Sequence, residues 1–258
     1  MTADFPLDVK KLVIGYKGKK QICISGPLDF NISQGQLYGL IGINGIGKST
    51  LIKTISGLLP PLEGQVLING QDIFKLNTQE RAKYISLVLT DRFNAGLATV
   101  EDIVKMGRYP YTNWQFGLSE KDREIINNAI EAVGLQDNRK SFFAELSDGN
   151  KQKVMIAKAL AQDTPLLILD EPTVHLDIKN RYIILEMLQN LTKNHSKTII
   201  FSGHDLDYML TFCDQLMLMT PDKLAIDPPS IFIETDAISK AFDLDASKIQ
   251  GLTAFSKI

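Results

Sequence analysis

The first part of the chain consists of short apolar runs separated by polar and turn residues. We expect three strands here, over Lys11–Tyr16, Gln36–Ile41 and Gln65–Ile68. The pair Asn69-Gly70 directly follows the third run, and this pair is typical of a tight turn between strands. The region up to this turn therefore predicts a layer made mostly of strands.

The pattern becomes helical between Asp91 and Ala161. Apolar residues in Glu120–Val133 recur at intervals of three and four, which places them on one face of a helix. These residues are Ile125, Ile126, Ala129, Ile130 and Val133. A further helix is expected over Val154–Ala161.

Short apolar strands alternate with a helix in the last third of the chain. We expect strands at Leu166–Leu169 and Thr198–Ser202, separated by a helix around Arg181–Leu191. The run Leu216–Met219 also reads as a buried strand, and the tail after Pro221 shows turns and a weak helical pattern. Alternation of strands and helices is typical of a parallel sheet. The patterns predict one unit over residues 1–258, with an α/β core at 1–90 and 162–258 and a helical subdomain inserted at 91–161.

Composition excludes some partners. The formal net charge is −2, and basic and acidic residues are mixed along the chain, so no global electrostatic attraction to nucleic acid is expected. No apolar run approaches the roughly 20 residues that a spanning helix needs, so a membrane role would require a partner. The two cysteines, Cys23 and Cys213, are far apart and lack metal-ligand spacing. We expect buried, reduced thiols in the cytosol rather than a disulfide.

A glycine-rich loop supplies the first candidate chemistry. Residues Gly42–Thr50 read GINGIGKST, which fits the pattern G-x-x-x-x-G-K-[ST] between a strand and a helix. Its backbone N–H groups and the positive end of the following helix suit the phosphates of a triphosphate. Lys48 would add a positive charge at the β and γ phosphates, and the Ser49 hydroxyl would ligate Mg²⁺. The predicted nucleotide contacts in the loop are Gly42, Asn44, Gly45, Gly47, Lys48, Ser49 and Thr50. The alternative is a glycine-rich turn that fits the pattern by chance.

Two adjacent carboxylates follow the apolar strand Leu166–Leu169. Buried acids are unfavourable unless they meet a cation or transfer a proton. Asp170 would therefore hold Mg²⁺, directly or through water, and Glu171 would accept a proton from the attacking water. A solvated acidic turn is the alternative, which the upstream glycine loop makes the weaker interpretation.

The sequence Leu146–Asn150 narrows the interpretation. Ser147 is a good helix N-cap and Gly149 allows close approach of the backbone, so a second helix N-terminus points at an anion. This stretch, with the basic residues after it, resembles the signature motif of the ATP-binding-cassette (ABC) family. The resemblance implies an ABC ATPase: a P-loop NTPase core with an antiparallel β subdomain and the inserted helical subdomain. It also implies that Ser147 and Gly149 contact the γ-phosphate bound to the other copy in a head-to-tail homodimer.

Other family landmarks occur in order, and the resemblance covers roughly residues 8 to 220. Tyr16 resembles the aromatic residue that stacks on adenine, although a tyrosine in a strand can also serve only in packing. Asp177 occupies the acidic position of the loop that crosses to the partner copy. His204 follows the strand Thr198–Ser202 and resembles the switch histidine that contacts the γ-phosphate, which implies a catalytic role.

The chain departs from the family pattern at the signature and at the lid loop. Asp148 and Asn150 replace the usual glycine and glutamine of the signature, and we expect the Asp148 side chain to point away from the phosphate. Thr90 stands where the family has a glutamine after a strand. A hydroxyl can bond a metal-bound water but reaches less far than an amide, so we expect weaker coupling to Mg²⁺ there.

The resemblance implies that the chain powers transport through a separate integral membrane permease. The chain would lie at the cytoplasmic face of the membrane and would engage a substrate-binding protein only indirectly. The segment Met106–Trp114 is similar to one in importers of iron–siderophore, haem and cobalamin complexes. The aromatic residues in and just after this segment either dock the permease or pack a local core. They are Tyr109, Tyr111, Trp114 and Phe116. Two alternatives are a soluble ABC ATPase of translation, repair or iron–sulfur assembly, and an exporter subunit.

Overall fold

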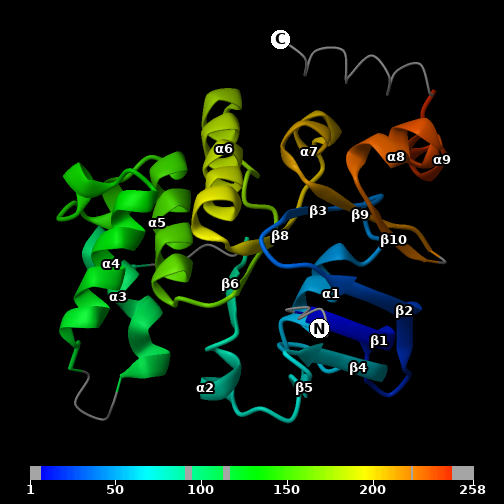
Figure 1. Ribbon diagram of the computed structural model, residues 1–258, viewed down its shortest axis with the longest axis horizontal. Helices are drawn as coiled ribbons and strands as arrows, with labels where there is room; N and C mark the ends of the chain where they lie inside the picture. The colour runs from blue at the N-terminus through cyan, green and yellow to red at the C-terminus, as the bar shows by residue number, and fades with distance from the viewer. Residues whose placement is uncertain (1–6, 91–94, 113–116, 222, 246–258) are drawn as a thin grey trace.

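Two sheets form the centre of the molecule (Figure 1). The computed structural model describes residues 7–90, 95–112, 117–221 and 223–245. A four-stranded antiparallel sheet has the order β2 (Ile22–Ile32), β1 (Leu7–Tyr16), β4 (Glu63–Ile68) and β5 (Gln71–Asp72). Strand β2 was not among the predicted strands, and Gly26-Pro27 interrupts its apolar pattern.

The second sheet has six strands and contains the predicted parallel arrangement. Its order is β10 (Leu224–Asp227), β9 (Gln215–Met219), β3 (Leu37–Ile41), β8 (Thr198–Ser202), β7 (Leu166–Leu169) and β6 (Ile85–Val88). All pairs are parallel except the edge pair of β10 with β9. Strand β8 lies between β3 and β7, so the carboxyl ends of these three strands adjoin.

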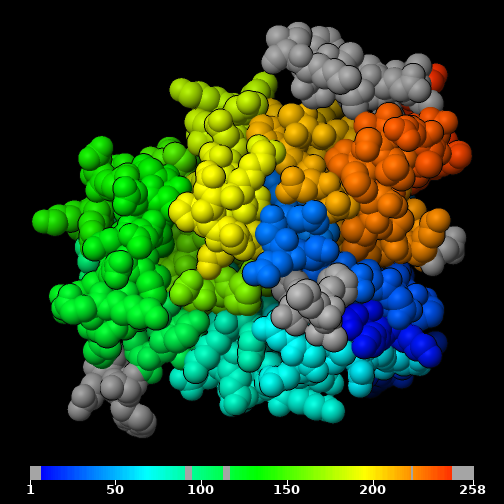
Figure 2. All heavy atoms as spheres, in the orientation of Figure 1, coloured from blue at the N-terminus to red at the C-terminus, as the bar shows by residue number. Residues whose placement is uncertain are grey.

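Helices cover the six-stranded sheet and form a layer beside it. Helix α1 (Lys48–Ile55) follows β3, α6 (Ile178–His195) follows β7, and α7 (Leu206–Phe212) follows β8. The layer at the left of Figure 1 contains α3 (Val100–Lys105), α4 (Glu120–Ala132), α5 (Asp148–Ala161) and the 3-10 helix η1 (Met106–Tyr111). Figure 2 shows this green layer against the yellow α6. Short helices complete the chain at α2 (Thr78–Arg81), η2 (Gln136–Asn138), η3 (Phe143–Glu145), α8 (Pro229–Glu234) and α9 (Ala237–Phe242).

The structure has two hydrophobic cores, and strand β7 contributes side chains to both. Leu167 and Leu169 belong to the core shared with the helical layer, whereas Leu166 and Ile168 belong to the core between the sheets. Alternate residues of a strand point to opposite faces, so an apolar run buried on both faces is continuous rather than alternating. This explains why the four-residue run Leu166–Leu169 predicted the strand with its observed bounds.

Most predicted elements are confirmed with small shifts at their ends. Helix α5 begins at Asp148 instead of Val154, because the Ser147 hydroxyl accepts a hydrogen bond from Asn150 N and caps it. The expectation that both cysteines are buried was wrong. Cys213 is buried, but Cys23 is exposed and lies at the start of β2, an edge strand of the four-stranded sheet. In the described part of the chain, no helix is both long and apolar enough to cross a membrane.

Arg108 is the polar centre of the helical layer. Its Nε lies 2.8 Å from Asp122 Oδ1, and its Nη1 donates to the Ala161 carbonyl oxygen at 2.9 Å. The Tyr111 ring covers the guanidinium, with its centroid 4.0 Å from Cζ. Arg108 is buried, so this one side chain ties η1 to α4 and to the end of α5.

Replacing Arg108 with alanine should lower the free energy of unfolding by about 3 kcal/mol, because Asp122 would keep a buried charge without its partner. Urea denaturation measures this. The matched control is Arg123→Ala, which removes an exposed pair on α4, the helix that carries Asp122, and should change the free energy by less than about 0.5 kcal/mol. Equal losses in the two variants would show that the buried pair has no special weight.

Candidate functional site

The glycine loop joins the end of β3 to the start of α1. Gly45 (φ 79°) and Gly47 (φ 113°) adopt left-handed backbone conformations, and a Cβ on Gly47 would lie 2.5 Å from Ile24 Cγ2. No side chain caps the N-terminus of α1, so its first N–H groups remain available for an anion.

Lys48 is buried inside this loop. Its ammonium donates to the Gly42 carbonyl oxygen at 2.8 Å, and its exposed fraction is 6%. Burial lowers the pKa of the Lys48 ammonium, and the negative charges of Glu171 and Asp170 partly offset that effect. A phosphate oxygen entering the loop would give this buried cation a stronger partner than a carbonyl oxygen.

The two carboxylates after β7 reach the glycine loop, although they are far away in sequence. Ser49 Oγ donates to Asp170 Oδ1 at 3.3 Å, and Asp170 is buried. Glu171 adopts a left-handed conformation (φ 50°), and its Oε1 contacts His204 Nε2. The loops after β3, β7 and β8 therefore meet at one edge of the sheet.

One cavity of about 400 Å³ collects these groups. It is lined by Ile24, Asn44, Gly45, Gly47, Lys48, Ser49, Thr50, Glu171 and His204. A hydrogen-bonding loop, a cation, a carboxylate and an imidazole around one space can bind a polyphosphate and accept a proton from a water beside it. Tyr16 borders the loop, since its hydroxyl lies 3.2 Å from Thr50 Oγ1, and its exposed fraction is 44%.

The oxygens of Ser49 and Asp170 fit a magnesium ion. Mg²⁺ prefers oxygen ligands and usually keeps waters and substrate phosphates beside one or two protein groups. Within the described residues there is no cluster of three or more His, Cys, Asp or Glu side chains that could hold a metal by themselves. A site of two protein oxygens completed by phosphate and water agrees with this finding.

The signature residues lie outside the 400 Å³ cavity. A Cβ on Gly149 would come within 2.7 Å of Asn180 Oδ1, so the start of α5 approaches the start of α6 closely. Asp177 caps α6 by accepting a hydrogen bond from Asn180 N at 2.7 Å. Asp148 is exposed, and its Oδ1 lies 3.9 Å from Lys151 Nζ. Its orientation relative to a phosphate of a second copy stays a prediction. Within one copy, Ser147, Gly149 and Asp177 therefore do not share the cavity of Lys48.

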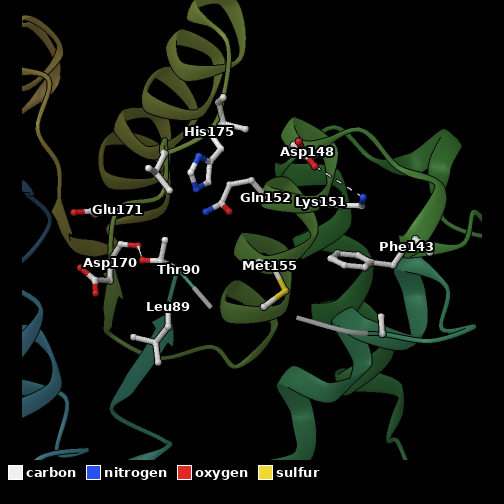
Figure 3. A pocket seen from close by; sticks show the side chains of 14 residues that line it. Leu89, Thr90, Phe143, Asp148, Lys151, Gln152, Met155, Asp170, Glu171 and His175 are labelled. Carbon is white, nitrogen blue, oxygen red and sulfur yellow. Dashed lines mark hydrogen bonds and ion pairs between the residues drawn. The ribbon is translucent and has the colours of Figure 1, made fainter. Parts of the chain in front are cut away.

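A larger cavity of about 600 Å³ opens between α5 and the end of β7 (Figure 3). Asp170 and Glu171 line it on one side, and Asp148, Lys151 and Gln152 line it on the other. Thr90, which was expected to bond a metal-bound water, lies beside Asp170, and its Oγ1 donates to the Asp170 carbonyl oxygen at 2.9 Å.

Sequence reasoning missed Ser202 as part of this site. Its buried hydroxyl donates to Asp170 Oδ1 at 2.7 Å and accepts a hydrogen bond from Glu171 N at 2.9 Å. The signal available in the sequence was a hydroxyl at the end of a short strand, directly after three apolar residues and two residues before His204. Such a polar group needs a buried partner, which only the neighbouring strand could reveal.

The order of the parallel strands, the glycine loop before α1 and the paired carboxylates after β7 define a P-loop nucleotide hydrolase. The model of the ABC transporter family matches residues 26–174, and the chain belongs to this family, whose ATPase cassette it carries.

Individual relatives agree with this assignment over almost the whole chain. The chain is 35% identical over 237 residues to the achromobactin transport ATP-binding protein CbrD of Dickeya dadantii. This alignment covers 92% of this chain and 87% of the relative. It is 35% identical over 242 residues to the iron(3+)-hydroxamate import ATP-binding protein FhuC of Bacillus subtilis, which covers 93% and 88%. A solved structure described as a metal-chelate-type ABC transporter in an inward-facing conformation superposes with a TM-score of 0.79 at 25% identity, covering 93% and 89%.

Lys48→Ala should lower ATP affinity about tenfold to hundredfold, because the phosphates would lose a charge-assisted hydrogen bond. Isothermal titration with ATP measures the change. Lys53→Ala is the matched control, since Lys53 is an exposed lysine in the last turn of the same helix. If both variants bound ATP like the parent, Lys48 would not be a phosphate ligand.

Proposed function

We propose that this chain is the ATP-hydrolysing subunit of an importer for metal chelates of the iron–siderophore, haem or cobalamin type. It would act as a head-to-tail homodimer at the cytoplasmic face of the membrane, beneath a separate permease that receives cargo from a substrate-binding protein. The observation that carries the hydrolytic part is the single cavity that holds Lys48, Ser49, Glu171 and His204. The names of the two relatives support the cargo class.

The charged groups at the site would each take a role in ATP hydrolysis. Lys48 and the N–H groups of the glycine loop would hold the β and γ phosphates, and Ser49 and Asp170 would hold Mg²⁺. The ion, when bound, neutralises charge that develops on the phosphate oxygens. Glu171 would accept the proton of the water that attacks the γ phosphorus, while the bond to the β–γ bridging oxygen breaks and ADP and phosphate form.

The position of His204 supports a role beside Glu171. Its Nε2 contacts Glu171 Oε1, and both side chains line the cavity of Lys48. His204 can therefore hold the carboxylate in place and contact the γ-phosphate. Tyr16 stands at the loop near Thr50, where an aromatic ring can stack on adenine.

The head-to-tail dimer follows from what one copy lacks. Ser147 caps α5 and Gly149 permits close approach there, but neither residue lines the cavity of Lys48. A second copy could present its own α5 N-terminus to the γ-phosphate, with Asp177 in the loop that crosses between copies. Closure on ATP and reopening after hydrolysis would then move the permease.

The aromatic segment proposed for docking is only partly described. The ring of Tyr111 packs on Arg108, which favours the local-core interpretation for that residue. Tyr109 is 55% exposed and remains a proposed docking residue. Trp114 and Phe116 lie outside the described residues.

Glu171→Gln should keep ATP binding but slow hydrolysis by at least about a hundredfold, because the proton acceptor is lost. The variant should accumulate as an ATP-bound dimer, which light scattering with and without ATP measures. Glu186→Gln, an exposed carboxamide substitution on α6, is the control and should behave like the parent. Hydrolysis at the parental rate in Glu171→Gln would show that another group is the base.

The transport role is tested by purifying the protein from native membranes. We expect a stoichiometric polytopic partner, and ATP-dependent uptake of a ferric chelate or cobalamin by the reconstituted complex. The complex carrying Glu171→Gln should assemble but not transport, which separates assembly from hydrolysis. Recovery of the protein with ribosomes or with a soluble scaffold would contradict the proposal.

A further inference from the structure

The peptide group between Asp170 and Glu171 is held on both sides by side-chain hydroxyls. Thr90 Oγ1 donates to its carbonyl oxygen at 2.9 Å, and Ser202 Oγ accepts from its N–H at 2.9 Å. Thr90 follows β6 and Ser202 ends β8, and these strands flank β7. Figure 3 shows Thr90 beside Asp170.

These two bonds continue the sheet beyond its last regular backbone bond. Asp170 N still donates to the Val88 carbonyl oxygen at 2.8 Å, as expected of a parallel ladder. The next residue, Glu171, has a φ of 50°, which turns the chain away from the strand direction. Because the backbones of β6 and β8 no longer provide partners at this point, hydroxyl groups on both neighbouring strands take their place.

The conformation of Glu171 needs such support. A residue with a side chain is disfavoured in the left-handed region and persists there only when surrounding contacts hold it. This conformation lets Glu171 reach His204 while Asp170 points at Ser49. Two adjacent residues can therefore serve one site only if the peptide group between them keeps its orientation.

Ser202 makes a third bond that links the backbone to a carboxylate. Its hydroxyl donates a hydrogen bond to Asp170 Oδ1 at 2.7 Å, and the exposed fraction of Ser202 is 0%. One buried hydroxyl thus orients the Asp170 side chain and the Glu171 backbone together. The Thr90 hydroxyl completes the arrangement from the opposite strand.

We propose that Thr90 and Ser202 are positioning residues that clamp the Asp170–Glu171 peptide. The clamp keeps Glu171 at the nucleotide cavity and the Asp170 carboxylate against Ser49. Thr90, at the position where a glutamine was expected, then acts on the backbone and does not bond a metal-bound water. The inference rests on the proposed function only in taking Asp170 as the metal ligand and Glu171 as the base.

Amide hydrogen exchange on the nucleotide-free protein tests the clamp without relying on activity. Ser202→Ala should speed exchange of the Glu171 amide on the order of tenfold, because this N–H loses its acceptor. The control is Thr164→Val: the Thr164 hydroxyl is also buried and lies 2.9 Å from Ser86 Oγ, but at the opposite end of β7. Unchanged protection of the Glu171 amide in Ser202→Ala would overturn the proposal.

Steady-state kinetics separate the clamp from a metal role for Thr90. Thr90→Val keeps the side-chain shape and removes the hydroxyl, so kcat should fall about three- to tenfold, the value of one hydrogen bond. The Thr90 hydroxyl donates to the Asp170 backbone, and Ser202 still holds the Asp170 carboxylate in this variant. The dissociation constant for ATP and the half-saturating Mg²⁺ concentration should therefore both stay within about twofold of the parent. Thr90→Ser keeps the hydroxyl and should restore kcat, whereas Thr164→Val should lower thermal stability and leave kcat unchanged.

Two kinetic outcomes would overturn the clamp. A raised half-saturating Mg²⁺ concentration in Thr90→Val would assign Thr90 to the metal, and a parental kcat in Thr90→Val would remove its positioning role. Coupling between Thr90→Val and Ser202→Ala in a double-mutant cycle is expected, since both act on one peptide. If the parental protein did not hydrolyse ATP, the proposed function would fail, and the exchange measurement would still decide the clamp.

Discussion

The candidate site depends on three parallel strands that end at the same edge of one sheet. Strand β8 lies between β3 and β7, so the glycine loop, the paired carboxylates and His204 meet there although they come from distant parts of the sequence. Ser49 and Asp170 are hydrogen-bonded across 121 positions for this reason. Without the parallel pairing, Glu171 and His204 would not line the same cavity as the glycine loop.

Burial makes the charges at this edge effective. Lys48 and Asp170 are both buried, and the negative charges of Glu171 and Asp170 offset part of the unfavourable desolvation of Lys48. Lys48 bonds a carbonyl oxygen of its own loop, so the loop is held in a phosphate-binding shape by the same side chain that would meet the phosphate. The site is therefore preorganised for an anion, which is the condition under which electrostatic stabilisation is strongest.

The helical layer is held together in part by the contacts of one buried arginine. Arg108 joins three of its elements, η1, α4 and α5, through a buried ion pair and a hydrogen bond to a carbonyl oxygen. The layer approaches the nucleotide core at two places that matter for function: the start of α5 against Asn180 of α6, and the large cavity beside Asp170. The helical layer therefore contacts the start of the helix that Asp177 caps, and it borders the strand end that carries the two carboxylates.

The sequence by itself determined the local elements and the identity of the reactive groups. Short, mainly apolar runs predicted β7 and β8 with their observed bounds, and the motif Gly42–Thr50 predicted the loop, because both signals are local in the chain. Only the tertiary structure decided which strands are neighbours. It alone showed that Thr90 and Ser202 hold one peptide group and that Ser147 lies outside the cavity of Lys48. Those facts depend on contacts between segments far apart in sequence, about which periodicity and motif spacing carry no information.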